Sequence, residues 1–144
     1  MKFSKKSRYG LRALIDLAVY SANGHVSLNS IAERNEISPQ YLEQVFASLR
    51  RAGIVKSVKG PQGGYLLKEP PESITVSEIL LALEGSYQLE TDDGKEKNIS
   101  DAIQTLLIDR INQQLDDIMQ NLTLKDLKED YLTRSGYEQD MYYI

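Results

Sequence analysis

The sequence contains no cysteine, and this absence excludes several kinds of chemistry together. Disulfide bonds, thiol nucleophiles and thiolate metal sites all require that residue. The chain also has no uninterrupted run of about 18 apolar residues, the length that a membrane-spanning helix needs. Its first ten residues, MKFSKKSRYG, lack the apolar segment of a secretion signal. We therefore expect a cytoplasmic protein that does not enter a membrane.

Residues suited to catalysis are scarce as well. The only histidine is His25, in a predicted loop, where we interpret it as a solvated side chain and not as a metal ligand. Neither a nucleophile-elbow pattern nor a phosphate-binding loop pattern occurs in the sequence. The sequence is therefore not typical of an enzyme, and we expect no bound metal and no other cofactor.

The net charge of -4 hides two halves of opposite sign. Residues 1–68 carry 11 Lys or Arg and 4 Asp or Glu, a net of +7. Residues 69–144 carry 6 basic and 17 acidic groups, a net of -11. This asymmetry indicates that the first half meets a polyanion while the second stays away from it. The alternative is an ordinary solvated surface with uneven charge.

Apolar residues at helical spacing predict a first helix over residues 7–22 and a short second helix over 28–35. The first has Tyr20 among its inward residues. A third helix starts at Ser38 and Pro39, which suit the N-cap and the first helical position, and it ends before Gly53. Two short helices joined by a tight turn are typical of a helix-turn-helix.

In a helix-turn-helix the N-terminal residues of the second helix enter the major groove of DNA. The residues that we expect to face DNA there are Ser38, Gln40, Tyr41, Glu43 and Gln44. Glutamine pairs with adenine, and glutamate accepts a hydrogen bond from the amino group of cytosine. The alternative is that these side chains only keep a surface helix soluble.

Residues 54–58 alternate between apolar and polar side chains, residues 59–64 form a glycine-rich turn, and residues 65–67 return as a partner strand. Such a hairpin behind a helix-turn-helix is typical of a wing. We expect Lys56, Lys59 and Gln62 to contact DNA from it. Further phosphate contacts are expected from basic residues outside the wing: Lys5, Lys6, Arg8 and Arg51.

A short helix over residues 75–83 and a polar loop over 86–98 lead into a much longer apolar pattern that starts at Ile99 and covers about 24 positions. A helix of that length measures roughly 36 Å. Its apolar side needs a partner, and homodimerisation supplies one. The alternative is a core helix that folds back within the chain. The expected dimer contacts are Ile103, Leu107, Ile111, Leu115, Ile118 and Leu122.

The fold class that these patterns predict is mainly α with a small two-stranded β wing. A winged helix-turn-helix is followed by a long dimerisation helix, and a final helix over residues 124–132 braces the dimer. The expected division is a DNA-binding domain (1–85), a polar loop (86–98), the dimerisation and bracing helices (99–132) and a mobile C-terminal tail (133–144).

Three stretches carry a family resemblance: RYGLRALIDLA at 8–18, SIAERNEISPQYLEQVFASLRRAGIVKSVKGPQGGYLL at 30–67 and ITVSEILLALEG at 74–85. They resemble the Rrf-two family of bacterial winged-helix transcription regulators. The resemblance implies a homodimer with crossed long helices that controls transcription in response to a signal. It also implies base contacts from Gln40, Glu43 and Gln44, and a wing contact in the minor groove from the position of Lys59. Lysine there, where the iron–sulfur cluster regulator of the family has arginine, favours phosphate contact instead.

Members of this family that hold an iron–sulfur cluster use three cysteines before the long helix, whereas residues 86–104 contain neither cysteine nor histidine. Cluster ligation rests on thiolates. The chain therefore resembles the cluster-free members, among them a repressor of cysteine metabolism that ends similarly. On that resemblance we hypothesise that Tyr142, Tyr143 and Ile144 dock into cysteine synthase.

The function that we predict is a dimeric, sequence-specific DNA-binding transcription regulator, a repressor without an iron–sulfur cluster that controls cysteine or sulfur metabolism. Its partners are an operator in double-stranded DNA, a second copy of the chain and cysteine synthase. One alternative is the same fold responding to a small-molecule or redox signal unrelated to sulfur. Another is a protein-interaction module without sequence-specific DNA binding, which would not require basic residues at the wing.

Overall fold

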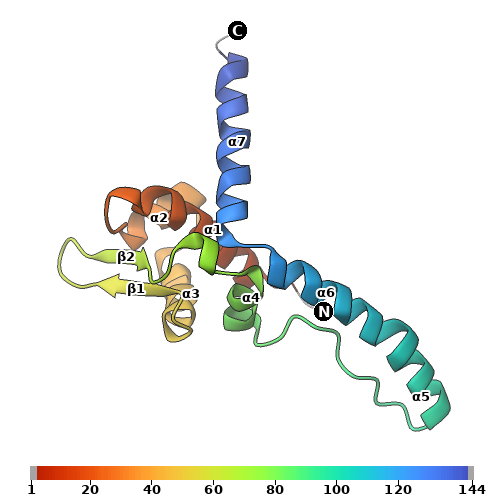
Figure 1. Cartoon of the computed structure of the whole chain (residues 1–144). Helices are drawn as coiled ribbons and strands as arrows, with labels where there is room; N and C mark the ends of the chain where they lie inside the picture. Colours follow the sequence, from red (N-terminus) through yellow and green to blue (C-terminus); the bar gives the residue numbers. More distant parts are fainter. Residues whose placement is uncertain (1–2, 143–144) are drawn as a thin grey trace.

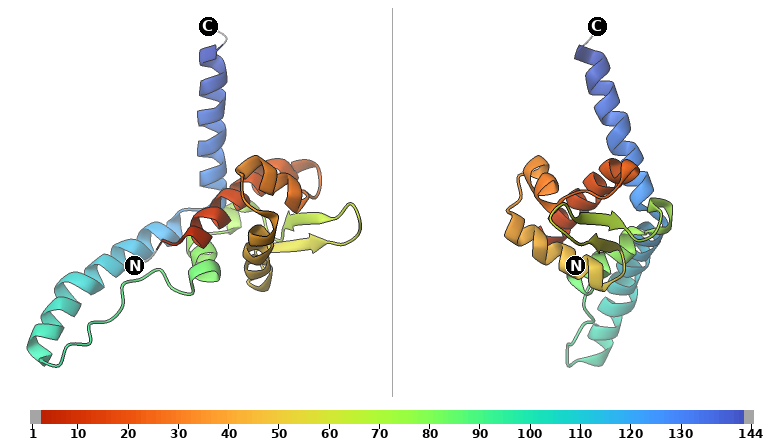
Figure 2. Two further views of the ribbon diagram at one scale, coloured as in Figure 1. Left: turned by 180° about the vertical axis from the view of Figure 1, so that it is seen from behind. Right: turned by 90° about the vertical axis from the view of Figure 1, so that its left-hand side faces the viewer.

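The computed structural model describes the backbone of residues 3–142 and the side chains of residues 3–136. Within these residues the chain is mainly helical, with one two-stranded sheet, as predicted. A winged domain carries two projections: a long helix and a final helix that points in another direction (Figures 1 and 2). None of the described helices is long and apolar enough to cross a membrane. The elements are α1 (Lys5–Tyr20), η1 (Ser21–Asn23), α2 (Leu28–Asn35), α3 (Pro39–Arg51), β1 (Val55–Val58), β2 (Gly64–Leu67), η2 (Pro71–Ser73), α4 (Val76–Glu84), α5 (Lys97–Ile103), η3 (Gln104–Ile108), α6 (Asp109–Asn121) and α7 (Leu124–Tyr142).

Hydroxyl side chains start the four helices of the winged domain. Ser4, Ser27, Ser38 and Thr75 each precede a helix, and each side-chain oxygen accepts a hydrogen bond from the backbone N–H three residues later. Such a cap satisfies one of the N–H groups that have no partner inside the helix. The start that the sequence predicted at Ser38 and Pro39 is confirmed.

The core of the winged domain lies where α1, α2, α3 and α4 meet the sheet. Phe46 is fully buried at its centre and packs on the ring of Tyr65, with 4.5 Å between ring centroids. The predicted inward side of α3 is buried as expected, including Leu42 and Leu49. Tyr20 was predicted to face inward from α1, and this prediction was wrong. Its side chain is 49% exposed because α1 ends there, and the guanidinium of Arg34 lies over its ring.

The wing is an antiparallel pair whose register places Val55 opposite Leu67 and Val58 opposite Gly64. A short bridge extends it, because the backbone N–H and C=O of Val26 both bond to Tyr65, at 3.0 and 2.8 Å. This close approach requires glycine at position 64, where an added Cβ would lie 2.3 Å from the carbonyl oxygen of Val26. The wing is thereby fixed to the segment that leads into α2.

A continuous helical segment runs from Lys97 to Asn121 through α5, η3 and α6. Glu96 caps its start, two residues before the predicted start at Ile99. The sequence did not predict η3, which is a π-helical turn of five residues. Just after the C-terminal end of this segment, two backbone hydrogen bonds join the chain to the winged domain. The N–H of Val76 donates to the carbonyl of Leu122, and the N–H of Leu124 donates to the carbonyl of Ile74, both at 2.8 Å.

The chain between α4 and α5 lies along the long helix and is held by three polar side chains of that helix, which we call the polar ladder: Gln104, Asn112 and Asp116. Asn112 accepts a hydrogen bond from the N–H of Leu89 (2.7 Å) and donates one to its carbonyl (3.2 Å). Gln104 accepts from the N–H of Asp92 (2.8 Å). The loop is therefore a fixed strap.

The π-helical turn explains how Gln104 and Asn112 reach the same strap. An α-helix turns by about 100° per residue, so side chains eight positions apart lie about 80° from alignment. A π-turn acts as one inserted residue and reduces the offset to about 20°. The turn lies between the two positions, over residues 104–108, and so contributes to the alignment of the ladder.

The loop was predicted to be polar throughout, and for Tyr87 this was wrong. Tyr87 is only 4% exposed and packs with Val76 and Leu80 of α4. Its hydroxyl donates to Asp116 (2.8 Å) and bonds with Ser77 (3.0 Å). Burial, the largest influence, raises the pKa of Tyr87, and the hydrogen bond to Asp116 raises it further against the opposing effect of Ser77. Tyr87 therefore joins the strap to both α4 and the long helix.

The last helix is longer than the sequence predicted. Leu124 is fully buried at its start, and the first half of α7 packs against α1. The helix then continues to Tyr142, whereas it was expected to end at Leu132. The backbone of residues 133–142 thus continues this helix, where the sequence predicted a separate C-terminal tail. Beyond the first half, α7 extends away from the winged domain (Figure 1).

Candidate nucleic-acid interface

The turn between α2 and α3 sets the direction of the helix that we expect to read DNA. Glu36 adopts a left-handed conformation with φ of 54°, which reverses the chain after α2. The N–H of Ile37 then bonds to the carbonyl of Ala32 at 3.0 Å, and the side chain of Ile37 is buried. These contacts hold α3 at a fixed angle to α2, as in a helix-turn-helix.

A buried carboxylate stabilises this turn from the side of α1. Asp16 accepts two hydrogen bonds from Arg34, at 2.7 and 2.9 Å, and one from Asn35 at 3.0 Å. The hydrogen bond from Arg34 to Asp16 is the main influence that raises the pKa of Arg34. A buried carboxylate requires such pairing. Sequence reasoning missed this network, although an aspartate on the apolar side of the first predicted helix was a signal for it.

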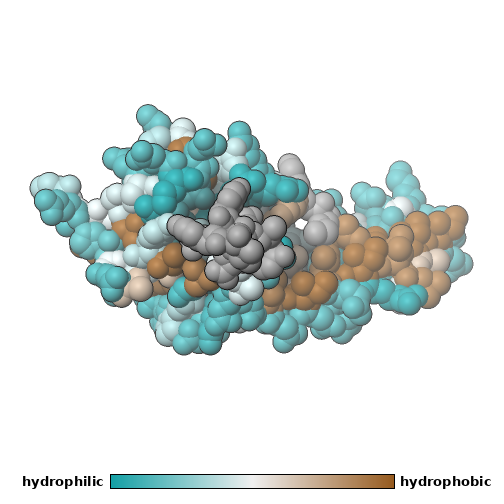
Figure 3. All heavy atoms as spheres, turned by 90° about the horizontal axis from the view of Figure 1, so that it is seen from above, coloured by the Kyte–Doolittle hydropathy of each residue, from teal (hydrophilic) through white to brown (hydrophobic). Residues whose placement is uncertain are grey.

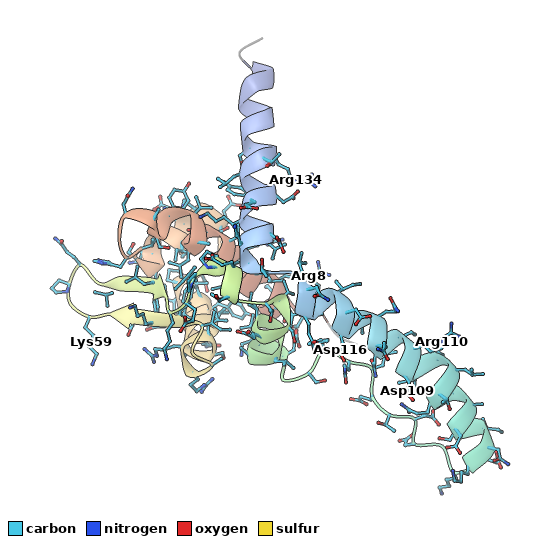
Figure 4. The ribbon with its side chains drawn as sticks, viewed as in Figure 1. Arg8, Lys59, Asp109, Arg110, Asp116 and Arg134 are labelled. Atoms are coloured by element: carbon cyan, nitrogen blue, oxygen red, sulfur yellow. The ribbon has the colours of Figure 1, made fainter. Side chains whose placement is uncertain are left out.

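A groove between the first turns of α3 and the wing brings predicted DNA contacts together. Gln40 and Glu43 line it from α3, and Lys59 lines it from the turn of the wing. Gln40 and Glu43 are exposed, and Lys59 lies at the tip of the wing (Figure 4). Gln44 is exposed on the next position of α3, outside the groove lining. The structure therefore places a glutamine, a carboxylate and an ammonium group around one concave surface.

Two of the predicted contacts on α3 also have structural roles. The hydroxyl of Ser38 accepts a hydrogen bond from the N–H of Tyr41 at 3.1 Å, so it serves first as the helix cap. Tyr41 was expected to be exposed, which is wrong. It is half-buried and meets the ring of Tyr9 edge-on, with centroids 5.6 Å apart. Aromatic side chains gain more from such packing than from hydration.

The wing tip is held by the one histidine of the chain. The Nε2 atom of His25 lies 2.5 Å from the backbone oxygen of Gln62, so the ring bonds to the wing although it is exposed. The side chain of His25 is therefore exposed, as predicted, and the hydrogen bond to Gln62 is a contact that the sequence did not predict. Of the other predicted wing contacts, Lys56 is exposed on β1 but does not line the groove.

The predicted phosphate contacts separate into two groups. Lys6 and Arg51 both donate to the hydroxyl of Ser48 on α3, at 2.9 and 3.2 Å. Arg8 instead donates to the carbonyl of Phe3 at 3.4 Å and lies far from Lys59 in Figure 4. The ammonium of Lys5 lies near the ring of Tyr9 (5.3 Å), and Lys5 is exposed. None of these four residues lines the groove.

The long helix exposes most of its predicted apolar stripe. Figure 3 shows hydrophobic residues gathered along this projection, and Leu107 is 55% and Ile118 58% exposed. Leu115 and Leu122 were also expected to contact a partner, but both are half-buried against the cluster of Val76, Leu80 and Tyr87 in the same chain. The exposed apolar residues of the stripe are Ile99, Ile103, Leu106, Leu107, Ile111 and Ile118.

Comparison with known proteins identifies the family of this chain. Residues 3–130 match the family described as "Rrf2: Iron-dependent Transcriptional regulator". The HTH-type transcriptional regulator CymR of Bacillus subtilis is 40% identical over 145 residues, with 100% of each chain covered. The regulator IscR of Cereibacter sphaeroides is 54% identical over 86 residues, which cover 58% of this chain and 56% of that protein.

Solved structures give the same relationship. The structure of Bacillus subtilis CymR superimposes with a TM-score of 0.78 at 40% identity and covers 90% of this chain and 97% of that one. That of T. potens IscR has a TM-score of 0.70 at 40% identity and covers 91% of this chain and 88% of that one. The chain therefore belongs to the Rrf2 family of DNA-binding, winged-helix transcription regulators, in a branch that resembles CymR.

Proposed function

We propose that this protein is a homodimeric transcriptional repressor that reads an operator with the groove between α3 and the wing. The observation that carries the proposal is the convergence of Gln40, Glu43 and Lys59 on that groove. The acidic half of the chain supports it, because most of that half forms the two projections, away from the wing (Figure 1). In this proposal residues 1–85 bind DNA, residues 86–98 form the connecting strap, and residues 99–132 hold the dimer together.

The groove, together with exposed residues of α3 and β1 outside its lining, offers two kinds of contact. Gln40 and Glu43, together with exposed Gln44, present hydrogen-bonding groups suited to base edges in the major groove. Lys59 and Lys56 supply positive charge for phosphates, which fix the register of the protein without reading the sequence. Lysine carries a compact, strongly hydrated charge, so Lys59 is better suited to a phosphate than to a narrow minor groove.

A homodimer accounts for the exposed apolar stripe of the long helix. Large contiguous apolar patches are uncommon on monomers and mark interfaces. The exposed side chains of Leu106 and Ile118, 68% and 58% accessible, have no cover within the described chain. Pairing two long helices would bury them and present two recognition helices to two half-sites of an operator.

We propose further that this regulator works without an iron–sulfur cluster. Such clusters are held by thiolates, and the sequence has no cysteine. Among the described residues, no group of three or more histidine, cysteine, aspartate or glutamate side chains is placed to hold a metal ion. The iron in the family description therefore does not fit the donor atoms of this chain. The strap is held by Asn112 and Gln104, which need no metal.

Control of cysteine or sulfur metabolism is the most specific part of the proposal. It is supported by the likeness to a structure entitled "The Structure of CymR (YrzC) the Global Cysteine Regulator of B. subtilis". Docking of cysteine synthase by Tyr142, Tyr143 and Ile144 would supply the signal. The side chain of Tyr142 and all of Tyr143 and Ile144 lie outside the described residues. Deleting the three residues should abolish binding to cysteine synthase and leave DNA binding intact, whereas unchanged binding to the enzyme would contradict the docking proposal.

The test of DNA recognition is selection from random duplexes, followed by fluorescence anisotropy at several salt concentrations. Lys59→Ala should weaken binding to every duplex by about five-fold and reduce the salt slope by about 1, since one phosphate contact is lost. The matched control is Lys95→Ala, which removes a lysine from the exposed end of the strap. Equal effects of the two variants would contradict a role for Lys59 in binding.

A second variant tests base reading. Glu43→Ala should change which duplexes are selected, since the acceptor for a cytosine amino group is lost. Glu33→Ala is the control, because Glu33 is exposed on α2 but does not line the groove. If Glu43→Ala lowered affinity uniformly across sequences, the residue would not read a base.

A further inference from the structure

A second concave site lies where α1, the end of α2 and the first half of α7 meet. It has a volume of about 430 Å³ and shares no lining residue with the groove that faces DNA. Seven side chains from these three helices form its walls: Arg12, Ile15, Asp16, Tyr20, Arg34, Asn35 and Tyr131. We call it the α1–α2–α7 cleft.

The charges of this cleft do not balance. The carboxylate of Asp16, with 8% of its side chain exposed, is engaged by Arg34 and Asn35. Arg12 makes no ion pair within the described chain, and its guanidinium lies 5.5 Å from the centroid of the Tyr9 ring. Arg12 is exposed, and the lining of the cleft carries two guanidinium groups and one carboxylate, so the charge of Arg12 is not paired with a carboxylate.

The walls indicate the chemistry of the missing partner. A guanidinium group binds carboxylates through a planar pair of donors. Ile15, Tyr131 and Tyr20, whose ring also lies under the guanidinium of Arg34, add apolar surface to the same lining. A small ligand site combines such apolar walls with a few placed polar groups. We propose that the α1–α2–α7 cleft binds a small organic carboxylate with an aromatic or apolar body, and that Arg12 is its main charge partner.

The position of the cleft couples it to DNA binding. Arg34 and Asn35 form the last turn of α2, directly before the left-handed turn at Glu36 that leads into α3. Tyr131 belongs to α7, which is separated from the end of the long helix by only two residues. A ligand that touches both would fix the projecting helices relative to the recognition helix. The cleft is therefore an effector site, and this role rests on the proposed DNA-binding function.

Benzoate is a suitable probe, and benzamide is its uncharged counterpart of similar shape. In an NMR titration of the full chain, benzoate should shift the backbone amides of Asp16, Arg34 and Asn35 saturably, whereas benzamide should not. Arg12→Gln should weaken benzoate binding at least about ten-fold. Lys125→Gln, which removes an exposed charge of α7 outside the cleft, should change it less than about two-fold. No saturable response at these amides, or an unaltered response in Arg12→Gln, would overturn the site.

The effector role is measured separately, as the affinity for a selected duplex with and without saturating benzoate. We expect at least about a three-fold change in the wild type and none in Arg12→Gln. Benzoate binding that leaves the DNA affinity unchanged would overturn the effector role. Failure to bind any duplex in the absence of benzoate would instead contradict the proposed function, and the NMR titration would still decide whether the carboxylate site exists.

Discussion

The winged domain and the long helix carry similar apolar periodicities but bury them to opposite extents. Phe46 and Leu42 of α3 are completely buried, whereas Leu106 and Ile118 of the long helix are 68% and 58% exposed. The four residues all follow helical spacing, so the pattern predicts a helix with an apolar side in both regions. Whether that apolar side is covered depends on whether the helix lies within the domain or projects from it. A periodic pattern therefore predicts the element and its sidedness, but not its partner.

The two regions also differ in what holds them in place. The winged domain is organised around apolar side chains that pack into one core. The strap along the long helix is instead held by hydrogen bonds with the side chains of Asn112, Gln104 and Asp116, and Tyr87 is its one buried side chain. Packing contributes more energy per residue than such hydrogen bonds, which each contribute about 1 kcal/mol. Perturbing the strap should therefore have smaller effects than perturbing the core or the dimer.

The largest effect is expected from a charge in the exposed stripe. Ile111→Asp should convert the dimer to a monomer and lower operator affinity by about 100-fold or more, because a carboxylate is costly to bury in an apolar interface. Light scattering measures the mass, and anisotropy measures the affinity. Gln120→Asp adds the same charge at an exposed position of α6 that is not part of the apolar stripe, and this variant should remain dimeric. A dimeric Ile111→Asp variant would show that the stripe is not the interface.

The core and the stripe can then be compared within one monomeric background. In the Ile111→Asp chain, Phe46→Ala should lower the free energy of unfolding by about 3–5 kcal/mol, because a buried ring leaves a cavity. Ile118→Ala should lower it by less than about 1 kcal/mol, since its side chain is 58% exposed. Urea unfolding gives both values. Similar losses from the two substitutions would mean that the long helix packs within its own chain.

The polar ladder should give a smaller and more local effect. Asn112→Ala removes both hydrogen bonds to Leu89 and should cost about 1–2 kcal/mol. Hydrogen exchange of the Leu89 amide should become faster, while the amides of the winged core keep their protection. Gln113→Ala is a control at the neighbouring exposed position. Unchanged exchange at Leu89 would show that the strap does not depend on the ladder.

Local chemistry explains which features were predictable from the sequence. Ser38 and Pro39 specify a helix start through their own backbone and side chain, so the start of α3 was predicted correctly. The wing was predicted from its alternating residues and glycines. The burial of Tyr41 and Tyr87 depends on residues distant in the chain, namely Tyr9 and Asp116. No local pattern contains that information.

Two further features depend on the whole segment and not on single residues. The π-turn over residues 104–108 lies in a sequence that is typical of an ordinary α-helix. The only sign of it is that Gln104 and Asn112 would point in different directions in a regular α-helix. The helix α7 continues to Tyr142 through a stretch with glycine at position 136, a residue that weakens helices. In the candidate site, Gln40 and Glu43 were predicted from the helix-turn-helix pattern and Lys59 from the glycine-rich turn of the wing. The hydrogen bond between His25 and the wing was not, because it joins residues 37 positions apart.

The smallest effect concerns Tyr87 and depends on pH. Burial raises its pKa above the ordinary value of about 10 because the phenolate would lose its hydration. The unfolded chain therefore releases this proton first as the pH rises. Stability from the neutral, buried phenol is complete below pH 10 and is lost as the pH rises from there through the pKa of the folded state.

Tyr87→Phe tests this dependence without changing the ring. At pH 8 the variant should be about 1 kcal/mol less stable, since the hydrogen bonds to Asp116 and Ser77 are lost. Between pH 8 and pH 10.5 the gap should narrow by roughly half or more, because only the wild type gains free energy from ionising residue 87 when it unfolds. Urea unfolding at the two pH values measures the gap, and the other tyrosines cancel in the difference. If the difference in unfolding free energy between wild type and variant stayed constant, Tyr87 would be exposed to solvent. It would then not anchor the strap, which would be an ordinary loop.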